Sequence, residues 1–273
     1  MIADDAYAEF ARVRAAVAAV RYPERVDYAI VVSGQDGAEY RSDRYRARYD
    51  TDTAVLRVQT ISERELAQPA SPHGFDLTLT ISLWGVVVLH TKNLTPTKAI
   101  EDLLGVPFLA PTYSFGIAHA SAPSLGPTPS PQGTGLKTIA VVSAAQHDYT
   151  VTLDGDETID GATFEHLTLR PLHDPNRYRL RELWVDSASK LPRRAIVSRN
   201  FTVAPEDTVA WSVDFATIEG GLYIESESAL STLQEAHGRA VSNATVTFDY
   251  APIETNVPAI PLDPGAFRAL QEP

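Results

Sequence analysis

The chain has 273 residues and a formal net charge of −12, from 35 acidic and 23 basic residues. Its content of 44% hydrophobic and 21% charged residues is ordinary for a folded soluble protein and excludes disorder of the whole chain. The negative charge argues against nucleic acid as a partner, because no Lys/Arg run is longer than the pair Arg193-Arg194. The absence of cysteine excludes disulfides, thiolate metal sites and cysteine nucleophiles.

The first predicted element is a helix from Asp4 or Asp5 to about Arg21. Its apolar residues recur at spacings of three and four, which places them on one face: Tyr7, Phe10, Val13, Val17 and Val20. No segment approaches the roughly 20 apolar residues that cross a bilayer. No basic and hydrophobic leader precedes the helix, so the chain is either cytoplasmic or a mature form from which an export signal was removed.

Strands are predicted next, over residues 26–33, 39–49, 54–61 and 75–83. A short helix follows over residues 96–104, with Thr95 as its cap and Pro96 at its first position. Residues 107–135 are rich in proline, serine and glycine, and we interpret them as a long excursion within one domain that covers residues 1–273.

The second half is predicted to be almost entirely strand. Turn residues separate the runs, notably at Asp154-Gly155-Asp156, Asp160-Gly161 and Glu219-Gly220-Gly221. The predicted strands cover residues 136–144, 149–153, 163–169, 178–185, 193–201, 209–215, 222–228 and 240–248. Short strands joined by tight turns favour antiparallel pairing of neighbours, and about twelve strands in one sheet must curl.

No motif for catalysis or for a cofactor is present. The seven histidines are scattered, and neither a zinc-protease helix motif, a serine nucleophile elbow nor a phosphate-binding glycine loop occurs. Residues 154–165 place oxygen-bearing side chains like those of a calcium loop, but Ile159 stands where that loop needs glycine. We favour a hairpin there, and expect no metal site, no cofactor and no catalytic residue.

Large apolar residues alternate with polar ones along three of the predicted strands. A broad curved sheet with few helices has more apolar inner surface than those helices cover, which leaves room for a ligand. The candidate ligand-binding residues on this concave face are Phe75, Leu77, Leu79, Ile81, Val209, Trp211, Val213, Phe215, Val246 and Phe248.

Two segments carry a resemblance to a known family. Residues 160–186 end in Trp184-Val185-Asp186, and the chain returns through Lys190-Leu191-Pro192-Arg193. This pattern resembles the central strands of the LolA/LolB-like lipoprotein-carrier superfamily, and the leading helix with strands 26–61 is similar to the opening of that superfamily. The resemblance implies a mostly β, α+β fold: a curved antiparallel sheet of about eleven strands that forms an incomplete barrel, with a few helices over its concave side.

The resemblance also implies a bacterial cell envelope, periplasmic or at the cell surface, and a hydrophobic ligand such as a lipid or a lipoprotein acyl chain. We therefore expect a non-catalytic carrier of such a ligand. The alternative is a structural or sensing module of the envelope that binds another protein through the same sheet. An interior filled by the chain's own side chains would count against the carrier.

Overall fold

The computed structural model describes residues 3–60, 76–85, 87–89, 103, 105–117, 148–198, 210–234 and 240–250. One helix and thirteen strands lie within these residues. Their bounds are α1 Ala3–Ala19, β1 Arg25–Asp36, β2 Glu39–Asp50, β3 Val55–Thr60, β4 Asp76–Ile81, β5 Val87–Leu89, β6 Tyr149–Ile159, β7 Ala162–Pro171, β8 Leu180–Val185, β9 Pro192–Ser198, β10 Ala210–Ile218, β11 Gly221–Ala229, β12 Leu233–Gln234 and β13 Ala240–Asp249.

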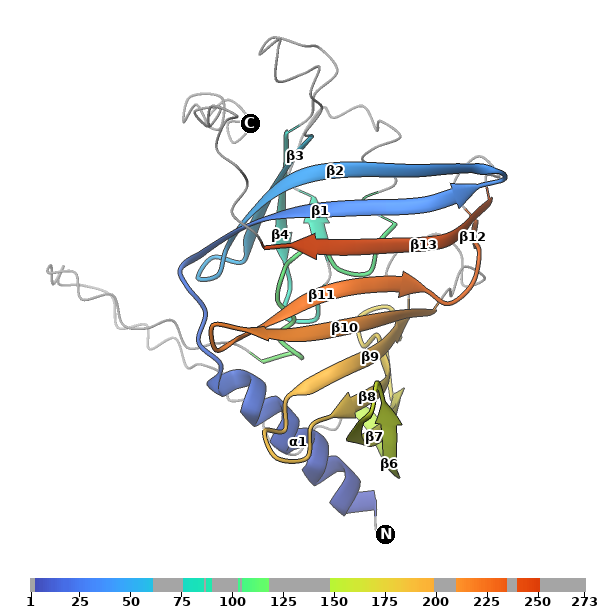
Figure 1. Cartoon of the computed structure of the whole chain (residues 1–273). Coiled ribbons are helices and arrows are strands. Elements are labelled where there is room, and N and C mark those ends of the chain that lie inside the picture. The colour runs from blue at the N-terminus through green and yellow to red at the C-terminus, as the bar shows by residue number, and fades with distance from the viewer. Residues whose placement is uncertain are drawn as a thin grey trace, which may run out of the picture.

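All the strands belong to one antiparallel sheet in the order β5-β4-β3-β2-β1-β13-β11-β10-β9-β8-β7-β6, and β12 pairs with β13. The order contains two meanders, β1 to β5 and β6 to β11, in which strands consecutive in sequence are neighbours. The last strand, β13, lies between β1 and β11 and joins the two meanders. Figure 1 shows the sheet bending from β2 and β1 at the top to β6 at the bottom.

Local chain geometry explains both the short connections and the bend. Two-residue turns close the hairpins β6–β7 at Asp160-Gly161 and β10–β11 at Glu219-Gly220, and all four of these residues have positive φ. Turns of this kind match the twist of an antiparallel pair. Register shifts interrupt β1 with β13, β6 with β7, β8 with β9, and β10 with β11. Such bulges bend the strand that carries them, so the sheet curls.

The concave face of the sheet is apolar. Its side chains form one large buried cluster that extends from β4 to β6 and includes α1. The helix lies at the β6 end of the sheet, where the ring of Phe10 meets that of Tyr149 edge to face at 5.8 Å. In the described part of the chain, no helix has the length and apolar character that a membrane crossing requires.

The predicted fold class is confirmed: the protein is mostly β, and its curved antiparallel sheet forms an incomplete barrel. Eleven of the thirteen strands have six or more residues, since β5 has 3 and β12 has 2. Of the predicted helix over residues 96–104, only Leu103 is described, and the predicted strand over residues 136–144 lies outside the described residues. The prediction of a single domain over residues 1–273 stays a prediction.

The turn predicted at Asp154-Gly155-Asp156 is wrong. The chain forms a bulge there, between Leu153 and Gly155, and β6 continues to Ile159. Residues 154–165 are therefore the end of β6, its turn and the start of β7, which is the hairpin that the sequence favoured over a calcium loop. The acidic residues of β6 are spread along an extended strand instead of converging on one point.

Candidate functional site

The predicted ligand-binding residues gather on the concave face. Phe75 and Val209 lie outside the described residues. The other eight are all buried and belong to the large cluster: Leu77, Leu79, Ile81, Trp211, Val213, Phe215, Val246 and Phe248. The predicted alternation of β4, β10 and β13 is thus confirmed, and the fold brings these three strands onto one apolar surface. Their role in ligand binding stays a prediction.

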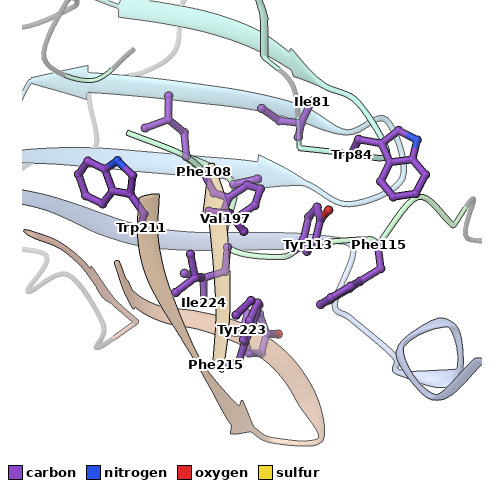
Figure 2. Packing of buried hydrophobic residues seen from close by; sticks show 14 of the residues in the cluster. Ile81, Trp84, Phe108, Tyr113, Phe115, Val197, Trp211, Phe215, Tyr223 and Ile224 are labelled. Atoms are coloured by element: carbon purple, nitrogen blue, oxygen red, sulfur yellow. The ribbon is translucent and has the colours of Figure 1, made fainter. Parts of the chain in front are cut away.

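An irregular segment, residues 105–117, covers this surface. It contains no described helix or strand, yet its apolar side chains are buried in the same cluster. Figure 2 shows Phe108, Tyr113 and Phe115 between Ile81 on one side and Val197, Phe215 and Ile224 on the other. We call residues 105–117 the inner segment. The sequence predicted a long proline-rich excursion over residues 107–135, and its described first part, residues 107–117, belongs to the core.

Hydrogen bonds to carbonyl groups hold the inner segment in place. The Tyr28 hydroxyl donates to the Leu109 carbonyl at 2.6 Å, and the Ile224 amide donates to the Pro111 carbonyl at 2.8 Å. The Gly116 amide donates to the Leu83 carbonyl at 2.9 Å. These contacts come from β1, β11 and the end of β4, so the segment is attached to both meanders.

Arg179 is the charged residue at the centre of the interior, and its side chain is 0% exposed. Its guanidinium donates to the Pro107 carbonyl at 2.6 Å and to the Trp84 carbonyl at 3.3 Å. It also lies over the Phe108 ring, with Cζ 4.5 Å from the ring centroid. Burial lowers the pKa of Arg179 to about 10, so the group stays charged at neutral pH.

Glu227 is the second ionisable group of the interior, also 0% exposed. It faces inward from β11, opposite Val213 of β10 and Val246 of β13. Burial raises the pKa of Glu227 well above its ordinary value, although the Phe108 amide and Arg179 both act to lower it. Glu227 and Arg179 interact electrostatically, but no hydrogen bond or ion pair joins the two side chains in the described part of the chain.

Sequence reasoning missed both residues, for two reasons. A charged residue on an inner face breaks the hydrophobic pattern, so hydropathy gave no signal for Arg179. In β11, simple alternation from Leu222 and Ile224 would point Glu227 outward. The bulge between Asp214 and Phe215 leaves one residue of β11 unpaired, because Phe215 is opposite Ile224 while Asp214 is opposite Ser226. That extra residue turns Glu227 inward.

A hollow of about 450 Å³ adjoins the interior. Its walls come from the β8–β9 turn and from β10 and β11, and they include Leu191, Pro192, Phe215 and Glu225. Arg193 also lines it and donates to the Phe215 carbonyl and, at 3.1 Å, to Glu225. Phe215 separates the hollow from the interior, where its ring lies 6.0 Å from that of Phe115.

His166 has the most acidic surroundings of the described histidines, and it lies outside the interior. Its two ring nitrogens lie 3.3 Å from Glu157 and 3.1 Å from Glu182. The ring is stacked on Trp184 at 4.4 Å, within a small apolar cluster separate from the interior. Within the described ranges, no group of three or more acidic and histidine side chains is arranged to hold a metal ion.

Comparison with known proteins gives matches in structure alone. No family model matches the sequence, and no curated protein matches it. The chain is similar to a DUF1329 family protein from Desulfovibrio piger, with a TM-score of 0.43 and 12% identity over 98% of each chain. It is also similar to a putative outer membrane lipoprotein-sorting protein domain from Vibrio parahaemolyticus, with a TM-score of 0.41 and 10% identity over 94% of this chain and 97% of that one.

A third similar structure is a LolA superfamily protein from Nitrosomonas europaea, with a TM-score of 0.39 and 12% identity over 88% of this chain and 90% of that one. The last two names agree with the family that residues 160–197 resemble.

Proposed function

We propose that this chain is a non-catalytic binding or carrier protein for a hydrophobic ligand, a lipid or an acyl chain, in the bacterial cell envelope. Side chains of the inner segment fill the concave face, and a filled interior counts against a carrier. The observation that carries the proposal is the nature of this cover: it is one irregular segment, without a helix or strand in residues 105–117, that can exchange with a ligand. Burial of apolar ligand surface, at about 25 cal/mol per Å², would supply the affinity. The resemblance of residues 160–197 supports a periplasmic or cell-surface location.

The ligand would take the place of the inner segment on the concave face. The segment and an acyl chain would cover the same apolar residues of the sheet, so those residues stay buried in the exchange. The burial of the ligand must offset the exposure of the segment's own apolar side chains, such as Phe108 and Phe115. The segment is also strained, because Phe115 is buried with φ 50, a backbone conformation that bulky residues avoid. Such strain costs about 1–3 kcal/mol, which lowers the cost of moving the segment out.

The hollow beside Phe215 offers a route to the interior. Apolar side chains of Phe164, Leu191 and Phe215 line it. Of its charged groups, Arg193 and Glu225 are paired with each other, and Asp186 is bonded within its own turn. An acyl chain that enters there reaches Phe215 first and then Phe115 of the inner segment. Movement of that one segment would connect the hollow with the concave face.

A thiol-labelling experiment tests the exchange, because the natural chain has no cysteine. Ala110→Cys places a thiol in the inner segment, at a residue that is buried in the structure, and Ala47→Cys places one at an equally buried position in β2. We expect dodecanoate to make the thiol at position 110 reactive and to leave the thiol at position 47 protected. Native mass spectrometry of the purified chain should also detect a retained lipid.

The opposite result would contradict the proposal. If the thiol at position 110 stays protected at saturating dodecanoate, and organic extraction of the purified protein releases no lipid, the interior is a permanent core. The carrier function would then be wrong.

The alternative function is an envelope module that binds another protein. The observation that favours it is the hairpin of β1 and β2, whose outer residues 39–44 are exposed, with Tyr40 exposed by 69%. A photo-crosslinker in place of the exposed Ser42, two residues from Tyr40 on the same strand, should then capture one envelope protein reproducibly. Capture would be lost with Tyr40→Ser if the tip makes the contact.

A further inference from the structure

We infer that the ligand of the concave face is an anionic amphiphile whose carboxylate or phosphate head binds Arg179 in the place now taken by the Pro107 carbonyl. The inference rests on the proposed function and narrows it, since it names the head group that the interior selects. It excludes neutral hydrocarbons and neutral esters as the preferred ligand.

Most contacts of the Arg179 guanidinium come from the inner segment. The guanidinium bonds to the Pro107 carbonyl, bonds to the Trp84 carbonyl and lies over the Phe108 ring. Pro107 and Phe108 both belong to the inner segment. When that segment leaves, the charged group keeps only the longer bond, of 3.3 Å, to Trp84.

The positive charge of Arg179 also requires a partner in the interior. A buried cation without a partner is costly, and among the described residues no carboxylate forms an ion pair with Arg179. Glu227 lies within electrostatic reach of Arg179, but among the described contacts no hydrogen bond joins the two side chains. A ligand that displaces the inner segment must therefore bring an acceptor for the guanidinium. A carboxylate or phosphate does so best, because it pairs with the planar guanidinium through two parallel bonds.

The interior also contains hydrogen-bond donors without an acceptor. The Nε atom of Arg179 and the indole Nε1 of Trp211 are buried without a hydrogen-bond partner in the described part of the chain. One strand lies between them: Val197 of β9 is paired with Trp211 on one side and with Leu180, next to Arg179, on the other. The two carboxyl oxygens of Glu227 are also buried without a partner in the described residues, so a ligand head with acceptors matches the donors of Arg179 and Trp211 in particular.

Fixed elements of the fold hold the backbone of Arg179, and they do so without the inner segment. The Ser198 amide donates to the Arg179 carbonyl at 3.0 Å, which fixes the backbone to the end of β9. The neighbouring Leu180 begins β8 and is fully buried. Arg179 therefore remains in the interior when the inner segment moves, as a ligand site requires.

The test compares three ligands with the same chain length: dodecanoate, dodecyl phosphate and dodecanol. Each is titrated at neutral pH into the full-length chain, and its binding is measured by displacement of a fluorescent probe from the interior. We expect the two anions to bind about tenfold more tightly than the alcohol, or better, which corresponds to at least one charge-assisted hydrogen bond. The tighter of the two anions identifies the head group.

Two variants assign the preference to Arg179. Arg179→Met should bind dodecanoate and dodecanol with affinities within about twofold of each other. Arg177→Met, which removes the same charge from an exposed residue two positions away, should keep the full preference. Arg179→Lys retains a buried cation and should keep part of it, so the series stays informative if the methionine variant does not fold.

The outcomes separate the two proposals. Equal binding of dodecanol and dodecanoate by the natural chain, or a preference that survives in Arg179→Met, would overturn the anionic head group and leave the carrier function standing. Failure of all three ligands to bind would overturn both.

Discussion

At the scale of single residues, Glu227 shows how a β-bulge changes the face of the sheet on which a side chain lies. The fold buries its carboxyl group completely, between Val213 and Val246, and burial raises its pKa well above the ordinary value. Above the ordinary carboxyl pKa the unfolded chain releases this proton while the folded chain keeps it. The folded state then binds more protons, so rising pH favours unfolding.

Glu227→Gln should flatten this pH dependence, because glutamine resembles the protonated acid and does not titrate. In the natural chain, the contribution of Glu227 is fully present below the ordinary carboxyl pKa and is lost as the pH rises towards the raised pKa. We expect the variant to be more stable than the natural chain by about 1–3 kcal/mol at alkaline pH, with the difference shrinking towards pH 5. Urea unfolding at several pH values measures it.

Glu225→Gln is the matched control for Glu227→Gln, since it changes an exposed carboxylate on the same strand. It should leave the slope of stability against pH unchanged. Equal slopes for the natural chain and Glu227→Gln would mean that Glu227 does not hold its proton.

Asp186 explains the pattern on which the family resemblance rests. Its carboxylate accepts bonds from the Ala188 amide at 3.2 Å and from the amide and hydroxyl of Ser189 at 2.7 Å each. These bonds hold the β8–β9 turn and lower the pKa of Asp186, with the Ser189 amide as the main cause. The aspartate after an apolar strand is thus a turn cap.

Asp186→Ala should lower the free energy of unfolding by about 1 kcal/mol, because the turn loses its acceptor. Asp186→Asn keeps one carbonyl oxygen in place, so it should lower the free energy of unfolding by a smaller amount than Asp186→Ala does. Chemical denaturation of the two variants beside the natural chain gives both differences, and equal losses would contradict the capping role.

At the scale of elements, the inner segment depends on close packing around its glycine. Gly116 has φ +76, and a Cβ atom there would overlap the indole ring of Trp84. Any residue other than glycine at position 116 would have a strained backbone and would clash with the Trp84 ring. The same Trp84 precedes Gly85, which lies against Phe108 of the segment.

Gly116→Ala should loosen the inner segment and raise the reactivity of a thiol at position 110 without any ligand. Gly220→Ala is the control, because Gly220 has a similar φ of +82 but no atom within 4 Å of its Cβ position. Gly220→Ala measures the backbone cost alone, about 1 kcal/mol. A larger loss of stability for Gly116→Ala, by about 1–3 kcal/mol, isolates the clash with Trp84.

At the scale of the whole molecule, one lysine ties the helix to the sheet. Lys190, in the β8–β9 turn, contacts Glu9 of α1 at 2.9 Å and Glu165 of β7 at 2.7 Å. Arg12 also bonds to Glu9. Burial acts to raise the pKa of Glu9, but the bonds from Lys190 and Arg12 outweigh it and lower the pKa.

Lys190→Met should destabilise the chain by about 1–3 kcal/mol at neutral pH, because the nearly buried Glu9 loses a partner. The stability from Glu9 is present above the ordinary carboxyl pKa and is lost as the pH falls through the lowered one. The difference between variant and natural chain should therefore shrink on acidification, as measured by thermal unfolding from pH 7 to pH 3. Arg12→Met should destabilise the chain less than Lys190→Met does, because the Arg12 side chain is 64% exposed.

Much of the fold could be predicted from local sequence. Alternation predicted the inner faces of β4, β10 and β13, and pairs such as Asp160-Gly161 predicted hairpin turns. These predictions succeed because side-chain alternation and turn conformation depend on a few adjacent residues. The error at residues 154–156 has the same origin, because Asp-Gly-Asp occurs in turns and in bulges alike.

The sequence by itself determined an antiparallel sheet of short strands with an apolar face, because these properties depend on the spacing of apolar residues and of turn residues along the chain. Only the tertiary structure decided that β13 joins the two meanders, that residues 105–117 fill the interior, and that Arg179 and Glu227 are buried there. The bond from Arg179 to Pro107 spans 72 residues of chain. No local pattern records such a contact, since it exists only after the sheet has curled and brought distant segments together.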